Sequence, residues 1–237
     1  MAERLLYTAL DHNDAKSNLD LAQSLSTDIS RANQPNSGFK INLDHVYKWG
    51  TGYIDNVKEF GRPVFVDLKM NNGERTMGNI VEDLVKKEVQ HVNVWALADR
   101  LIIPLAEITK GSNTKLLAVT VTTHFDDKFC QKNFGRNLQE TVRHFAKIGI
   151  DYGCDGIIIP GTTLDAVSDI DCIKLVPGIR PVWYKDKKAN NQEQTVTPTE
   201  AIKGGANILV CGSPIYKSDY PPQEAMALVY EEMLQAA

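Results

Sequence analysis

The sequence lacks the segments by which several classes of protein are recognised. No apolar run approaches the roughly 20 residues that span a bilayer. The first residues, Met-Ala-Glu-Arg, do not have the apolar core of a signal peptide. There is no run of basic residues, and the net charge of −4 disfavours a nucleic-acid-binding or polybasic membrane-binding surface. We therefore expect a cytoplasmic protein that binds neither membrane nor nucleic acid.

Motifs for metals and common cofactors are also missing. The four cysteines are scattered without a CxxC pair, which predicts reduced thiols rather than disulfides or a zinc knuckle. The five histidines show neither HxH nor HExxH spacing, so we expect no zinc site. The phosphate loops GxGxxG and GxxxxGKS/T and the GxSxG nucleophile elbow do not occur.

What the sequence does contain is an alternation of short apolar strands with amphipathic helices. The expected strands are 5–11, 38–43, 63–69, 91–96, 115–122, 156–160, 173–177 and 207–211. The expected helices are 15–25, one ending at 59, 74–88, 102–108, one ending at 148, a short one from 164, 198–203 and 224–234. Strands this apolar are typical of a parallel sheet buried on both faces. Eight such units without a linker predict a single α/β domain over residues 1–237, a (β/α)₈ TIM barrel, with a doubly wound open sheet as the alternative.

The third expected strand ends in charged residues. Asp67 and Lys69 follow the apolar run Val64-Phe-Val66, and residues i and i+2 of a strand point to the same face. Burying such a pair costs several kcal/mol per ion before the attraction between them offsets it. This cost favours a preorganised acid–base site over the alternative, a structural ion pair.

Other polar residues follow neighbouring strands, where the active sites of such barrels lie. Asp11 and Lys40 are taken as the polar ends of the first two strands, so three strands direct charge to one mouth. Glycines follow strands seven and eight, after Pro177 and at Gly212, where backbone N–H groups commonly hold a phosphate. The long loop 179–195 carries Arg and Lys residues suited to closing over an anion. The alternative explanation is that these glycines only allow tight turns of the backbone.

Several blocks of sequence together resemble one known family. They are Ala-Leu-Asp at 9–11, Phe-Lys-Ile at 39–41, Asp-Leu-Lys at 67–69, Leu-Ala-Val-Thr-Val-Thr-Thr at 117–123, Val-Pro-Gly-Ile-Arg-Pro at 176–181, Thr-Pro-Thr-Glu-Ala-Ile at 197–202 and Gly-Ala-Asn-Ile-Leu-Val-Cys-Gly at 205–212. In these blocks the chain is similar to orotidine 5′-monophosphate decarboxylases over nearly its whole length. The resemblance implies a homodimeric barrel that converts orotidine monophosphate to uridine monophosphate in pyrimidine biosynthesis, without metal or organic cofactor.

The resemblance also implies roles for individual residues. Lys69 would protonate the pyrimidine carbon as carbon dioxide leaves, with Asp67 beside it. Asp11 and Lys40 would hold the ribose hydroxyls and extend the charge network. Thr76 would reach into the neighbouring subunit's site. The base pocket and the phosphate end would be formed by Thr123, Arg180, Gln192 and Gly212.

Three positions depart from the family pattern. Asn72 stands where the family has an aspartate, which removes one negative charge from the catalytic network. Ser213 stands where the family has an arginine, so the main cationic phosphate clamp is missing. His124 replaces a serine that reads the pyrimidine; a lone histidine here is more often a polar loop residue.

These departures keep two other hypotheses open. One is a related phosphosugar enzyme such as a hexulose-phosphate-synthase-like lyase, although those enzymes carry a glutamate where this chain has Lys40. The other is a weakly active or silent barrel that only binds nucleotide. Intact Asp67 and Lys69 argue against a silent barrel.

Overall fold

The structure is a computed structural model that describes residues 4–27, 36–185 and 194–236. Its strands are β1 (Leu5–Ala9), β2 (Ser37–Asn42), β3 (Val64–Met70), β4 (His91–Trp95), β5 (Lys115–Val119), β6 (Gly156–Ile158), β7 (Ile173–Val176) and β8 (Ile208–Cys211). Its helices are α1 (Ala15–Thr27), α2 (Leu43–Trp49), α3 (Gly52–Lys58), α4 (Glu74–Lys86), η1 (Ala96–Leu101), α5 (Ile102–Thr109), α6 (Asp127–Phe134), α7 (Leu138–Asp151), η2 (Gly161–Val167), α8 (Pro198–Lys203), α9 (Ser213–Tyr216) and α10 (Pro222–Gln235).

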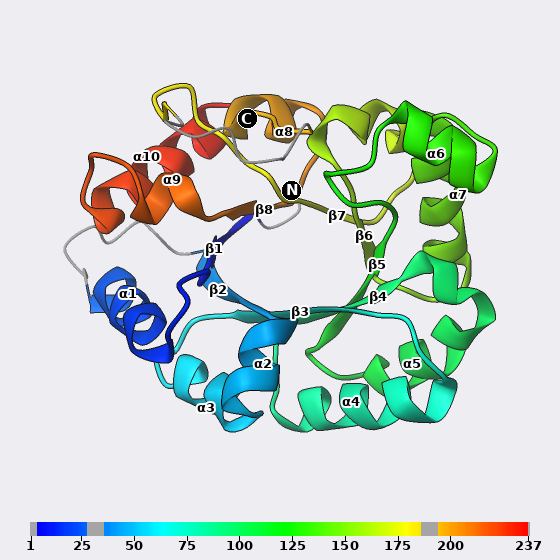
Figure 1. Cartoon of the computed structure of the whole chain (residues 1–237), viewed down its shortest axis with the longest axis horizontal. Helices are drawn as coiled ribbons and strands as arrows, with labels where there is room; N and C mark the ends of the chain where they lie inside the picture. Colours follow the sequence, from blue (N-terminus) through cyan, green and yellow to red (C-terminus); the bar gives the residue numbers. More distant parts are fainter. Residues whose placement is uncertain (1–3, 28–35, 186–193, 237) are drawn as a thin grey trace.

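The strands close into a barrel in the order of the sequence. Each strand pairs in parallel with the next, and β1 also pairs with β8. Figure 1 looks along the barrel and shows the strands as an inner ring surrounded by the helices. The prediction of a single-domain (β/α)₈ barrel is confirmed, and the open-sheet alternative is wrong. No helix within the described ranges is long and apolar enough to cross a membrane.

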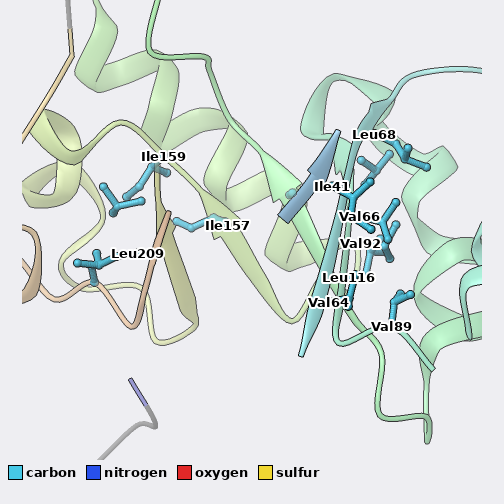
Figure 2. Packing of buried hydrophobic residues seen from close by; sticks show 14 of the residues in the cluster. Ile41, Val64, Val66, Leu68, Val89, Val92, Leu116, Ile157, Ile159 and Leu209 are labelled. Atoms are coloured by element: carbon cyan, nitrogen blue, oxygen red, sulfur yellow. The ribbon is translucent and has the colours of Figure 1, made fainter. Parts of the chain in front are cut away.

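Strand side chains alternate between two hydrophobic cores. The larger core lies between the strands and the helices, and Figure 2 shows part of it, with Ile41, Val66 and Val92 from three adjacent strands. The smaller core fills the barrel interior; its members include Phe65 and Leu117. On β3 the outward residues are Val64, Val66 and Leu68, so Phe65 and the charged residues after it face the interior.

Several expected elements are divided or shortened. The helix expected to end at 59 is two helices, because Gly50 between them has a φ of 75° that ends the first. The segment before residue 148 is likewise divided into α6 and α7 at Gly135, with a φ of 68°. β1 and β5 end at Ala9 and Val119, short of the expected 11 and 122, because the chain leaves the strand ladder at the barrel mouth. The loop expected to close over an anion begins and ends in the bridge between Ile179 and Val196, and its residues 186–193 lie outside the described residues.

Candidate active site

A cavity of about 550 Å³ opens at the carboxyl ends of the strands. Its apolar floor is the top of the barrel core, formed by Phe65, Val119, Ile158, Leu175 and Val210. Charged and polar side chains stand around this floor, as expected for the catalytic face of such a barrel. The setting is one in which water is partly excluded and charges act strongly on one another.

Asp67 and Lys69 form a close ion pair in this cavity. The Lys69 Nζ donates to both carboxylate oxygens of Asp67, at 2.6 and 2.7 Å. The Asp67 side chain is only 10% exposed, whereas that of Lys69 is 39% exposed. Burial alone would raise the pKa of Asp67, but Lys69, Lys40 and the hydrogen bonds to the carboxylate outweigh it, so the pKa is lowered. Asp67 is therefore a carboxylate at neutral pH, and the Lys69 side chain lines the cavity beside it.

Asn93 hydrogen-bonds to this part of β3 from the neighbouring strand, and it was not among the residues predicted from the sequence. Its Nδ2 donates to the Asp67 Oδ1 at 2.7 Å, and its Oδ1 accepts from the backbone N–H groups of Leu68 and Lys69. The side chain is fully buried on β4. A polar residue in the middle of an apolar strand was the available signal, because such a residue needs a buried partner.

Lys40, Asn42 and Asp11 form a second polar group beside the first. The Lys40 Nζ lies 3.2 Å from the Asp11 Oδ1 and 2.5 Å from the Asn42 Oδ1. The Asn42 Nδ2 also donates to the Asp11 Oδ1 at 2.7 Å. Lys40 and Asp11 were expected here, whereas Asn42 was not. Asn42 is opposite Asp67 in the β2–β3 register, so the two groups are adjacent.

The opposite wall of the cavity is formed by the ends of β7 and β8. Pro177, Gly178, Arg180, Gly212 and Ser213 line it, as do Tyr216 and Lys217, which sequence reasoning missed. The Arg180 guanidinium lies 6.0 Å from the centre of the Tyr184 ring, and the Lys217 Nζ lies 5.7 Å from that of Tyr216. Gly178 has a φ of 75°, a left-handed conformation that favours glycine. This wall thus combines two cations with close backbone approach, a combination suited to an anion.

Of the other site residues predicted from the sequence, some line the cavity, some do not, and one is not described. Thr123 is buried and lines the cavity, and the exposed His124 stands beside it. Asn72 and Thr76 do not line the described cavity; the Asn72 Oδ1 instead accepts from the Gly73 N–H at 2.7 Å, within its own turn. Gln192 lies outside the described residues.

Metal-ligating groups and thiols are not gathered at this mouth. In the part of the chain that the structure describes, no three His, Cys, Asp or Glu residues are arranged to hold a metal ion. The four cysteines are free, and three of them are buried. The polar side chains that line the cavity include the lysines, aspartates and asparagine described above.

Comparison with known proteins places this geometry in a family. The orotidine 5′-phosphate decarboxylase / HUMPS family model matches residues 4–228. The orotidine 5′-phosphate decarboxylase of Staphylococcus aureus is 32% identical over 192 residues, 77% of this chain and 81% of that protein. That of Carboxydothermus hydrogenoformans is 30% identical over 227 residues, 91% of this chain and 90% of that protein. The crystal structure of orotidine 5′-phosphate decarboxylase from Lactobacillus acidophilus shares the fold, with a TM-score of 0.78 at 24% identity, covering 98% of this chain and 99% of that one. Because the family model spans almost the entire sequence, the chain belongs to the orotidine 5′-phosphate decarboxylase / HUMPS family.

Proposed function

We propose that this chain decarboxylates orotidine 5′-monophosphate to uridine 5′-monophosphate, as a cytoplasmic step of pyrimidine biosynthesis carried out by one catalytic domain over residues 1–237. The observation that carries the proposal is the Asp67–Lys69 pair, which fixes an ammonium group above the apolar floor of the cavity. The relatives from Staphylococcus aureus and Carboxydothermus hydrogenoformans, both orotidine 5′-phosphate decarboxylases, support this reaction. The hexulose-phosphate-synthase-like alternative has no observation of its own in its favour.

The reaction needs a cation and a proton at one carbon of the pyrimidine ring. The bond between that carbon and the carboxylate breaks, carbon dioxide leaves, and the electron pair stays on the ring carbon. Lys69 stabilises the developing negative charge and then donates its proton to the same carbon. Asp67 keeps Lys69 in place, and the 39% exposure of the Lys69 side chain lets solvent restore the proton.

The polar side chains of the cavity suggest where the ribose and the pyrimidine of the substrate bind. Asp11, Lys40 and Asn42 hold the ribose hydroxyls, because their oxygens and nitrogens face the cavity beside the catalytic pair. Thr123 and His124 contact the pyrimidine from the end of β5.

The phosphate binds at the wall formed by β7 and β8. Gly178 and Gly212 allow the backbone to approach it, and Pro177, Arg180 and Ser213 complete this wall. Ser213 cannot supply the charge of the arginine that it replaces. Lys217, four residues later, lines the same cavity and supplies that charge. Gln192 would contribute from the loop between β7 and α8.

We also propose a homodimer. Asn72 and Thr76 lie outside the described cavity of their own subunit, on the exposed turn before α4 and in its first turns. Their position is consistent with contact to the substrate of a neighbouring subunit, which the family resemblance implies for Thr76. In that position Asn72 supplies an amide where the family has a carboxylate.

The function is tested by incubating the purified protein with orotidine monophosphate and following the loss of its ultraviolet absorbance. We expect saturable conversion to uridine monophosphate. Replacement of the exposed Lys110 by alanine is the control and should not change the rate, because Lys110 pairs with Glu107 on the surface and does not line the described cavity. Unchanged orotidine monophosphate together with cleavage of a hexulose phosphate would instead establish the lyase alternative. Tight nucleotide binding without turnover would establish the silent one.

A further inference from the structure

Asn93 is unusual among the polar residues near the catalytic pair because it does not face the cavity. It lies in the middle of β4, between His91 and Trp95, with no solvent exposure. It is not part of the cavity wall, so it cannot touch a bound substrate. A buried primary amide is costly unless its donors and acceptor are satisfied.

Its contacts fall on three consecutive residues of the neighbouring strand. The Oδ1 accepts from the N–H of Leu68 at 3.0 Å and from that of Lys69 at 2.7 Å. The Nδ2 donates to the Asp67 Oδ1 at 2.7 Å. Two N–H donors require the oxygen on one side and the carboxylate requires the NH₂ on the other, so the orientation of the amide is fixed.

These contacts coincide with an irregularity in the strand pairing. The register of β3 against β4 shifts between Val66 and Met70. Within this bulge Lys69 has a φ of 47°, a left-handed conformation that a residue with a side chain rarely adopts. Residues held in such conformations persist only where the surrounding structure fixes them. The Asn93 oxygen takes the two N–H groups inside the bulge.

We propose that Asn93 is a positioning residue: one buried amide holds the bulge that aims Lys69 and, at the same time, the carboxylate that orients its ammonium group. Asn93 acts through Asp67 and Lys69 and does not contact substrate. The reaction it serves is the proposed decarboxylation, so the inference rests on that function, whereas the geometry it maintains can be tested separately.

The most informative variant is Asn93→Asp, which has nearly the same shape. Its carboxylate can still accept from both backbone N–H groups, but it faces the carboxylate of Asp67 instead of donating to it. The charged groups near Asp67 are Lys69 on its own strand and Lys40 on β2, with Asp11 beyond Lys40. A second carboxylate among them favours protonation and raises the pKa of Asp67. We expect kcat to fall about 100-fold at neutral pH, as for a small displacement of a catalytic group. The acidic limb of the pH profile should move to higher pH, and KM should change much less.

Asn207→Asp is the matched control. The Asn207 Oδ1 also accepts from the backbone of a neighbouring strand, the Lys174 N–H at 2.8 Å, but Asn207 lies at the opposite end of the barrel, away from the cavity. This variant should keep the wild-type kcat and pH profile. Thermal melts and uridine monophosphate binding by calorimetry identify variants that are folded and able to bind nucleotide.

Two kinetic outcomes would overturn the proposal. One is an Asn93→Asp variant that retains kcat within about threefold of wild type. The other is a loss of kcat matched by an equal loss of nucleotide affinity with no shift of the acidic limb, which indicates a merely structural residue. A crystal structure of Asn93→Ala adds a test that is independent of activity. A displaced Lys69 supports the proposal, and an unchanged contact between Lys69 and Asp67 refutes it. A wild type inactive on orotidine monophosphate would count against the proposed function, and the crystal structure would still decide the role of Asn93.

Discussion

Replacing Lys69 by alanine should abolish decarboxylation and should also reverse the way in which protein stability responds to pH. In the wild type the pKa of Asp67 is lowered, because Lys69 and Lys40 outweigh the effect of burial. A lowered folded pKa contributes stability that is present above the unfolded value of about 3.9. That contribution is lost as the pH falls through the folded pKa.

The size of the effect follows from the geometry. Two unit charges 2.6 Å apart attract by about 6 kcal/mol at an effective dielectric constant near 20. The net loss is smaller, because the Lys69 side chain is 39% exposed and water can replace part of its interaction. Lys40 and Asn93 also remain near the carboxylate. Removing one partner of a buried pair costs about 3–5 kcal/mol, so we expect about 2–3 kcal/mol at pH 7. For a chain of this length that lowers Tm by roughly 4–12 °C.

The sign of the pH dependence is the sharper test. Without Lys69, burial dominates and the folded pKa of Asp67 rises above its unfolded value, so Lys69→Ala should regain stability between pH 7 and pH 5. Urea unfolding at the two pH values measures this, with Lys110→Ala as the control. The double variant Asp67→Asn with Lys69→Ala has no buried unpaired charge, and its unfolding free energy should lie within about 1 kcal/mol of wild type. A Lys69→Ala variant with no pH-dependent instability, or one that retains most of the decarboxylation rate, would refute the reasoning.

Two further predictions concern the phosphate end and the assembly. Lys217→Ala should raise KM for orotidine monophosphate roughly tenfold, the equivalent of a charge-assisted contact of about 1.5 kcal/mol, but should not affect the weak turnover of orotidine, which has no phosphate. Adding Ser213→Arg should restore KM, whereas Lys203→Ala, on α8 away from the cavity, should have no effect; equal losses for both substrates would contradict this role for Lys217. Light scattering at micromolar concentration should show a dimer, and Thr76→Arg should shift it towards monomer and lower kcat/KM. A fully active wild-type monomer would remove the proposed role of Thr76 across the interface.

The fold could be predicted from the sequence because its signal is local and repeated eight times. Strands buried between an inner and an outer core are apolar at nearly every position, which separates them from amphipathic helices. Element ends were less predictable, because they depend on where strand pairing stops. The division between α2 and α3 could have been recognised in the sequence, because a glycine that can end a helix, Gly50, is followed by Thr51, a residue type that often begins one. In the structure Gly50 has a φ of 75° and ends α2.

Many residues that line the cavity could be predicted because they lie at the ends of the strands, but a close contact between two side chains was easiest to predict where one strand contains both partners. Asp67 and Lys69 are two residues apart, so alternation along a single strand places them together. Asn93 and Asn42 act across strands, and their partners depend on register. The register of β3 against β4 includes a bulge that no local pattern specifies. Lys217 was missed for a different reason: it follows the short helix α9, where a lysine resembles any other surface residue.

The distribution of charge in the cavity links substrate orientation to chemistry. Among the described residues that line it, four are cationic and two are carboxylates. Both carboxylates, Asp11 and Asp67, bind lysines on β2 and β3. Arg180 and Lys217 bring positive charge to the β7–β8 wall, and under the proposed function this charge attracts the phosphate of the substrate. In the proposed function, a phosphate bound at this wall would place the other end of the nucleotide at Lys69, on the opposite side of the barrel mouth. Binding energy gained at the phosphate would then be used to orient the reacting ring.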